Sequence, residues 1–281
     1  MSAANLSSLG KMSTLSHQPE TVSPTRFSIQ IAQIASHWQT ARRIAMLTGA
    51  GVSTESGVPT FRGKEGLWNS FKPEELASMT AFLANPKIVW EWYNWRRDLL
   101  GKAEPNDGHR AIVTMTTLTR HFTLITQNVD GLHQRAGSKD ILELHGNISV
   151  NKCVDCNKIH DAELEIDPSH IASCTACRGR LRPGVVWFGE NLDPDVIDEA
   201  NEAARESDLF FVVGTSALVY PASQLPLIAK QAGATVIEIN PEETPLSDLV
   251  DFRFAAPSGE VLPALVDAIR RQTEQRKRES V

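Results

Sequence analysis

The stretch "IAMLTGAGVS" (residues 44–53) predicts a buried strand that runs into a glycine turn. Three later runs repeat this pattern: "FTLITQNVDGLH" (122–133), "DLFFVVGTSA" (208–217) and "TVIEINPEE" (235–243). Each is an apolar run of strand length whose carboxyl end carries Gly, Ser, Thr, Asn or Asp. Helical segments lie between these runs, and strands that alternate with helices predict an α/β fold with a doubly wound parallel, Rossmann-like sheet. Ligands bind at the carboxyl ends of the strands in such sheets.

Two segments interrupt the alternation and predict an inserted small lobe. One follows the first strand and contains the aromatic stretch "VWEWYNWRRDLL" (89–100), and the other is a turn-rich region with every cysteine of the chain. We therefore expect a zinc ribbon and a helical module beside the sheet. The expected organisation is a disordered leader (1–28), Rossmann-like parts (29–62, 109–150 and 184–270), a helical insertion (63–108), a zinc-binding insertion (151–183) and a charged tail (271–281).

Composition excludes some classes of function. The chain has 281 residues, of which 41% are hydrophobic and 22% charged, as in an ordinary globular enzyme. A net charge of −6 argues against general nucleic-acid binding, which needs clustered basic residues. The longest apolar region (208–229) is interrupted by glycine and proline, so we expect no membrane span. We expect a cytoplasmic monomer, with mitochondrial targeting by the Ser- and Thr-rich leader as a minor alternative.

The four cysteines form two C-x-x-C pairs in a C-x2-C-x17-C-x2-C arrangement. Each pair can turn two sulfurs toward one ion, and two such pairs complete a tetrahedral zinc site. Four thiolates leave no open position, so the zinc is expected to be structural. The alternative is free buried thiols. The predicted ligands are Cys153, Cys156, Cys174 and Cys177.

The glycine turn indicates a nucleotide site only weakly, because a glycine-rich turn also occurs without a ligand. It departs from the dehydrogenase fingerprint, since its third glycine and the later ribose-binding acid are absent. His145 precedes a glycine at the start of the cysteine region, where a structural histidine is the plain alternative. Gln127, Asn128 and Asp130 follow a strand, and turn formation alone would also explain Asn and Asp there.

The ordered set of motifs resembles the sirtuin family of NAD-dependent protein lysine deacylases over roughly residues 40–260. The motifs are "GAGVSTESGVPTFRG" (49–63), "TQNVDGLH" (126–133), "ELHGN" (143–147), the two cysteine pairs, "VVWFGE" (185–190), "VGTS" (213–216) and "EIN" (238–240). The resemblance implies that NAD is a consumed co-substrate bound by Gly49, Ala50, Gly51, Glu55, Phe61, Arg62, Trp68, Gln127, Asn128, Asp130, Gly214, Thr215, Ser216, Asn240 and Ser258.

The resemblance also implies the chemistry. Nicotinamide leaves as the acyl oxygen attacks the ribose, His145 acts as the general base, and the products are free lysine, nicotinamide and O-acyl-ADP-ribose. Val186 and Phe188 would wall the tunnel for acyl-lysine. Substrate peptides, the expected partners, would add as a strand between residues 188–191 and 217–221.

The aromatic stretch raises the question of why two arginines lie in it. Tyr93 and Arg96 are three residues apart and share a helical face, and with Thr60 they resemble the sirtuin branch that removes succinyl, malonyl and glutaryl groups. We expect both to bind an acyl carboxylate, with Arg97 as the alternative reader. The alternative without a ligand is an arginine whose aliphatic stem packs on an aromatic helix while its charge reaches water. Trp92 and Trp95 are expected to pack into the small lobe.

Three rival functions stay open at the level of sequence. A mono-ADP-ribosyltransferase would cleave NAD in the same way but use another acceptor. A zinc-ribbon module that senses NAD without catalysis is the second rival, and a dehydrogenase is a distant third.

Overall fold

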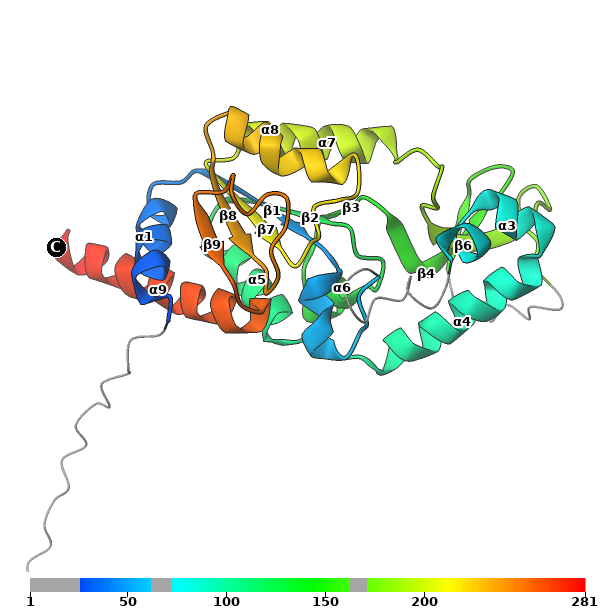
Figure 1. The fold of residues 1–281 in the computed structure, drawn as a ribbon, viewed down its shortest axis with the longest axis horizontal. Helices are drawn as coiled ribbons and strands as arrows, with labels where there is room; N and C mark the ends of the chain where they lie inside the picture. The colour runs from blue at the N-terminus through cyan, green and yellow to red at the C-terminus, as the bar shows by residue number, and fades with distance from the viewer. Residues whose placement is uncertain (1–25, 62–71, 162–170, 281) are drawn as a thin grey trace, which may run out of the picture.

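The computed structural model describes residues 26–61, 72–161 and 171–280. Within them a parallel sheet has six strands in the order β3-β2-β1-β7-β8-β9, which confirms the predicted doubly wound fold (Figure 1). The chain fills one side of β1 first and then crosses to β7 on its other side, so the switch in strand order lies between β1 and β7. The strands are β3 (Ile141–Glu143), β2 (His121–Thr126), β1 (Arg43–Thr48), β7 (Leu209–Val213), β8 (Thr235–Ile239) and β9 (Phe252–Phe254). The edge strands β3 and β9 were not predicted, because three residues are too short for a clear pattern.

Helices cover both faces of the sheet, as Figure 1 shows. In β1, Ile44 and Met46 point to a core shared with one set of helices, and Ala45 and Leu47 point to a second core on the opposite face. This two-sided burial explains why the strand is apolar throughout. The first face carries α1 (Ser28–Trp38), α5 (Asp107–Thr117) and α9 (Ser258–Glu279), and the second carries α7 (Pro194–Glu206) and α8 (Leu225–Gln231). Shorter helices are α6 (Leu132–Ala136) and the 3₁₀ helices Ala50–Ser56 and Ala222–Gln224.

The small lobe joins a helical module to an antiparallel sheet with the order β5-β4-β6. Its helices are α2 (Pro73–Leu76), α3 (Met79–Ala84) and α4 (Pro86–Lys102), and its strands are β4 (Gly146–Cys153), β5 (Ile159–Asp161) and β6 (Leu181–Val185). The cysteine region therefore contains more strand than its turn-rich sequence indicated, and β4 starts five residues before the expected boundary. A separate apolar cluster, with Phe82, Trp90 and Leu181 fully buried, holds the module to the sheet.

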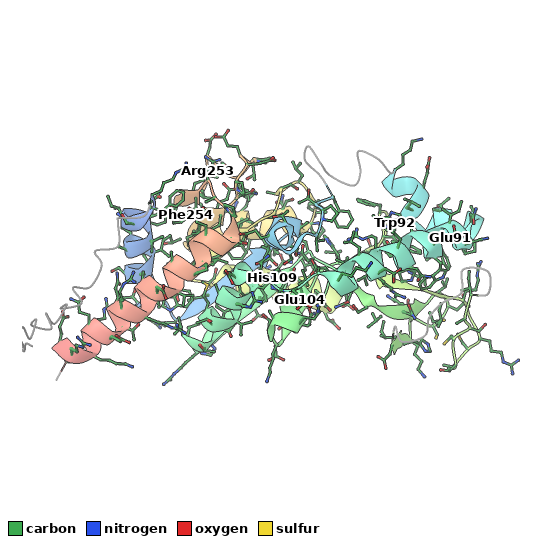
Figure 2. All side chains as sticks on the ribbon, turned by 90° about the horizontal axis from the view of Figure 1, so that it is seen from below. Glu91, Trp92, Glu104, His109, Arg253 and Phe254 are labelled. Atoms are coloured by element: carbon green, nitrogen blue, oxygen red, sulfur yellow. The ribbon has the colours of Figure 1, made fainter. Side chains whose placement is uncertain are left out.

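Helix α4 is the element that carries the aromatic stretch into the small lobe. Asn85 caps it by accepting a hydrogen bond from the Ile88 amide (3.3 Å), and Pro86 occupies the first turn. Trp92, labelled on α4 in Figure 2, is buried, but Trp95 is 44% exposed. The expected burial of Trp95 was therefore wrong, since the helix buries the face at 89, 92/93, 96 and 100 and residue 95 lies off it.

The chain ends of the expected organisation are only partly described. Most of the expected leader lies outside the described residues, and α1 begins at Ser28, the last residue of that expected leader. The charged end forms the last turns of α9 through Glu279. No helix in the described ranges has the length and apolarity needed to cross a membrane.

Candidate active site

A cavity of about 860 Å³ lies at the carboxyl ends of β1, β2, β7 and β8, beside the small lobe. Its size suits a ligand such as a dinucleotide, and ligands of doubly wound sheets bind at this edge. Most of the predicted site residues line it: Gly49, Ala50, Gly51, Phe61, Tyr93, Arg96, Gln127, Asn128, His145, Val186, Phe188, Gly214, Thr215, Ser216 and Asn240. The fold thus gathers side chains that lie up to 191 positions apart, from Gly49 to Asn240.

Two glycine turns meet backbone to backbone at the floor of the cavity. A Cβ atom at Gly51 would lie 2.7 Å from Gly214 Cα, and one at Gly214, where φ is +60°, would lie 2.5 Å from the Val52 nitrogen. The Gly51 amide donates to Gly214 O (2.7 Å). Glycine is required here because the turns touch each other, which is a reason the sequence did not show. Their predicted role in cradling a pyrophosphate stays a prediction.

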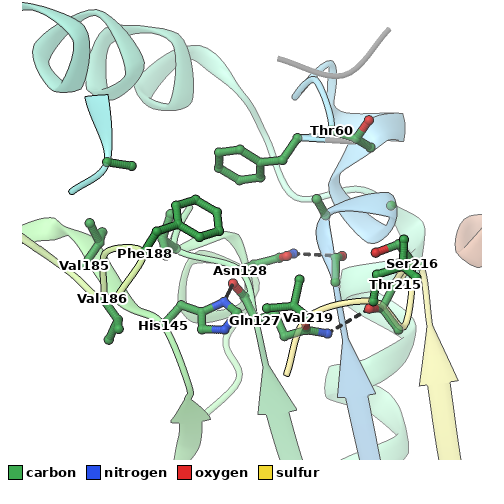
Figure 3. A pocket seen from close by; sticks show the side chains of 18 of the residues that line it. Thr60, Gln127, Asn128, His145, Val185, Val186, Phe188, Thr215, Ser216 and Val219 are labelled. Carbon is green, nitrogen blue, oxygen red and sulfur yellow. Dashed lines mark hydrogen bonds between the residues drawn. The ribbon is translucent and has the colours of Figure 1, made fainter. Parts of the chain in front are cut away.

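Hydrogen bonds fix the polar side chains that follow β2. Asn128 Nδ2 donates to Gly49 O (3.1 Å), and Gln127 Nε2 donates to Thr215 Oγ1 (2.8 Å), as the dashed lines in Figure 3 show. Asn240 Nδ2 donates to the backbone oxygen of Thr215 (2.8 Å). These bonds tie the ends of four strands, β1, β2, β7 and β8, into one preformed rim, so a nucleotide would meet amide and hydroxyl groups that are already oriented.

His145 lies on the cavity wall, between the rim after β2 and the start of β4. Its Nδ1 is 3.0 Å from the backbone oxygen of Gln127 (Figure 3). A carbonyl oxygen only accepts, so Nδ1 carries a proton, and in the neutral ring Nε2 is the basic nitrogen. This bond fixes the tautomer that a general base needs.

The acyl side of the cavity is formed by apolar walls and the inner face of α4. Val186 and Phe188 line the cavity near His145 (Figure 3), and Tyr93 and Arg96 line it from the small lobe. Tyr93 and Arg96 are both only 4% exposed. The Arg96 Cζ atom lies 4.4 Å from the centre of the Phe61 ring and 5.3 Å from that of Trp92. Arg97 is not part of the wall.

Several predicted cofactor residues do not reach the wall. Glu55 Oε2 accepts hydrogen bonds from the Gly259 amide (2.8 Å) and from Ser258 Oγ (3.3 Å), so the two residues tie the first 3₁₀ helix to the start of α9. Asp130 lies behind the rim, where it accepts from Ser53 Oγ (2.7 Å). Arg62 and Trp68 lie outside the described residues. Contact between these five residues and NAD stays a prediction.

The four cysteine sulfurs come together at the end of the small lobe, all within 4.8 Å of one another. The Sγ atoms of Cys153 and Cys177 are 3.4 Å apart, and those of Cys156 and Cys174 are 3.6 Å apart. Tetrahedral zinc with bonds of about 2.3 Å would separate its sulfurs by about 3.8 Å, so the residues fit this metal. The residue after each pair, Asn157 or Arg178, has a positive φ, which gives both turns the same shape.

Sequence reasoning missed three residues that shape the site. Trp187 lines the cavity and contacts Tyr93; its position between two predicted wall residues of "VVWFGE" was the available signal. Ser53 Oγ accepts a hydrogen bond from Asn128 Nδ2 (3.3 Å) and donates one to Asp130. The available signal was its position just after the glycine turn. Thr60 lines the cavity, although the sequence linked it only to the resemblance to the acidic-acyl branch and gave it no contact with a ligand.

Comparison with known proteins agrees with this geometry. The model of the Sir2 family matches residues 49–221. The NAD-dependent protein deacylase of Aquifex aeolicus is 54% identical over 81% of this chain and 95% of its own length. NAD-dependent protein deacylase 1 of Archaeoglobus fulgidus is 48% identical over 82% of this chain and 94% of its own length.

A solved structure shows the same fold with NAD present. The crystal structure of a Sir2 homolog–NAD complex superimposes with a TM-score of 0.80 and 46% identity, over 85% of this chain and 94% of the other.

Proposed function

This chain belongs to the Sir2 family, and on that premise we propose that it is an NAD-dependent protein lysine deacylase that removes succinyl and malonyl groups, and also acetyl groups, from lysine. The names of its relatives favour deacylation over mono-ADP-ribosyl transfer and over NAD sensing without catalysis. The preference for acidic acyl groups rests on the side chains of this chain alone.

The observation that carries this preference is the state of Arg96. The residue is buried, and its Nη1 atom has no hydrogen-bond partner among the described residues. Burial lowers the pKa of the guanidinium because the charge is held away from water. A buried charge is costly unless it is paired, and a carboxylate can pair with a guanidinium through two parallel hydrogen bonds. An acyl chain that ends in a carboxylate supplies the missing partner.

The remaining residues fit the roles of a deacylase. Val186 and Phe188 provide apolar walls for the aliphatic part of an acyl-lysine. His145 can accept a proton at Nε2, because Nδ1 is committed to Gln127 O. NAD, when bound, supplies the ribose carbon to which the acyl oxygen adds as nicotinamide leaves. Asn128 and Gln127, held by their own hydrogen bonds, are placed to orient it.

A panel of acyl-lysine peptides tests the proposal directly. One peptide is prepared with acetyl-, succinyl- and malonyl-lysine, incubated with NAD, and followed by mass spectrometry. We expect free lysine, nicotinamide and O-acyl-ADP-ribose in equal amounts, with the larger kcat/KM for the acidic acyl groups. A larger kcat/KM for acetyl-lysine would contradict the acyl preference, and ADP-ribosylated protein with the acyl group intact would contradict deacylation.

A further inference from the structure

Trp187 and Tyr93 form a buried hydrogen bond across the two halves of the small lobe. Trp187 follows strand β6, Tyr93 lies on α4, and the indole Nε1 donates to the Tyr93 hydroxyl oxygen at 2.9 Å. Both side chains line the cavity beside Arg96. The bond therefore joins the wall of the acyl tunnel to the helix that carries the arginine.

This bond decides what the Tyr93 hydroxyl can do. An indole N–H is a donor only, so the phenol oxygen is the acceptor and its single proton remains for another group. None of the hydrogen bonds between described residues has the Tyr93 hydroxyl as its donor. Burial raises the pKa of Tyr93 to about 12, so this proton stays in place at neutral pH. Tyr93 and Arg96 thus both offer donors to the cavity.

The orientation of Trp187 is itself fixed by its surroundings. The Arg182 guanidinium lies 3.6 Å from the centre of the indole ring, and Arg182 is paired with Glu190, with 2.9 Å between Nη2 and Oε2. The same Glu190 oxygen accepts the Trp187 backbone amide (2.8 Å). Phe82 packs at 5.4 Å from the ring. These contacts hold the indole ring in one orientation, with its N–H directed at the Tyr93 hydroxyl.

We propose that Trp187 is a positioning residue that fixes the Tyr93 hydroxyl as a hydrogen-bond donor, so that the site selects acyl chains ending in a carboxylate over those ending in a carboxamide. This inference rests on the proposed function. A carboxylate accepts hydrogen bonds through two oxygens and can meet each donor with its own oxygen, whereas a carboxamide has one accepting oxygen and a donating NH₂ group in place of the other. Without the indole N–H, the Tyr93 oxygen can accept from that NH₂ group, and the discrimination weakens.

The test compares succinyl-lysine with its terminal carboxamide analogue in one peptide. Trp187→Phe keeps an aromatic ring and removes the N–H, and we expect the carboxylate-to-carboxamide ratio of kcat/KM to fall about tenfold. Trp90→Phe is the matched control. Trp90 lies on α4 with Tyr93, and its buried Nε1 has no hydrogen-bond partner among the described residues. That variant should keep the wild-type ratio.

A double-mutant cycle with Tyr93→Phe separates positioning from packing. We expect Trp187→Phe to change the ratio less than twofold once the Tyr93 hydroxyl is absent. An equally large fall in that background, or an equal loss for both peptides in Trp187→Phe, would overturn the proposal. If Trp187→Phe does not fold, β-(3-benzothienyl)alanine at position 187 replaces N–H by sulfur in the same ring shape. A wild-type protein without preference for succinyl- over acetyl-lysine would instead refute the proposed function.

Discussion

Arg96 and Arg97 are adjacent in the sequence but contact different surroundings on two faces of α4. The Arg96 guanidinium lies over the Phe61 ring in the cavity. Arg97 turns about 100° away, as neighbours on a helix do, and donates to Ile148 O (2.8 Å), Val150 O (3.1 Å) and Asn151 Oδ1 (2.8 Å). Arg97 thus fastens the helical module to β4, and Arg96 is the arginine left for a ligand.

Replacing each arginine by methionine should separate these two roles. Arg96→Met should lower the succinyl-to-acetyl ratio of kcat/KM at least about tenfold, because hydrogen bonds to charged groups contribute about 1.5–3 kcal/mol each. Arg97→Met should leave that ratio within about twofold but lower the free energy of unfolding by about 2 kcal/mol or more. Steady-state kinetics on paired peptides and urea unfolding measure the two effects. Equal losses for both peptides in Arg96→Met would show that the residue only supports packing.

His145→Ala should abolish deacylation while the fold and NAD binding persist. The variant removes the imidazole whose tautomer is fixed by the Gln127 carbonyl, and a general base contributes about 10²–10⁴-fold. Formation of free-lysine peptide from succinyl-lysine peptide gives the rate of deacylation, and calorimetric titration gives the affinity for NAD. A folded variant with wild-type turnover would exclude His145 as the base.

Zinc should be present at one ion per chain and should hold the small lobe together. Cys174→Ser removes a buried ligand, so we expect loss of the metal and a lower Tm, because the binding energy of a structural zinc is folding energy. Elemental analysis of the purified protein and thermal unfolding with and without a chelator are the measurements. Active protein that contains no zinc would refute the assignment.

Acidification should destabilise the protein through two buried histidines, His109 and His133, whose ring centres are 4.9 Å apart. Burial lowers the pKa of His109 to about 4, with Asp130 opposing and Arg110 adding to this shift, and burial together with the nearby charge of His109 lowers the pKa of His133 to about 3. An unfolded histidine has a pKa of about 6.5, so the unfolded chain binds more protons between that pH and about 4. The two histidines therefore cost no stability above about pH 6.5. Below that pH the free energy of unfolding falls by up to about 1.4 kcal/mol per pH unit for each histidine.

Urea unfolding at pH 5.0 and 7.5 checks this dependence. We expect His133→Gln to show a smaller loss of stability on acidification than the wild-type protein, since one of the two buried groups no longer binds a proton on unfolding. The exposed His121→Gln is the control and should keep the wild-type loss. The same loss in all three proteins would mean that other groups carry the pH dependence.

The sequence by itself determined the sheet, the metal site and most of the cavity wall. Strands buried on both faces are apolar throughout, so residues 44–48 and 209–213 could be recognised without knowledge of their neighbours. The ends of parallel strands meet at one edge, which brought Gln127, Asn128 and Asn240 together as expected. Cysteine spacing is a local property, and it indicated the zinc site directly.

The tertiary structure alone decided which side chains face the ligand and what they can donate. Helical spacing left both Arg96 and Arg97 open, and only the family resemblance favoured Arg96, because the contacts of each depend on how α4 packs against β4. The Trp187–Tyr93 bond joins residues 94 positions apart, and no local pattern encodes such a pair. Glu55 and Ser258, both predicted to bind NAD, lie 203 positions apart and are joined by a hydrogen bond that no local pattern indicates. Local chemistry thus selects the elements, and their long-range packing assigns each polar group its partner.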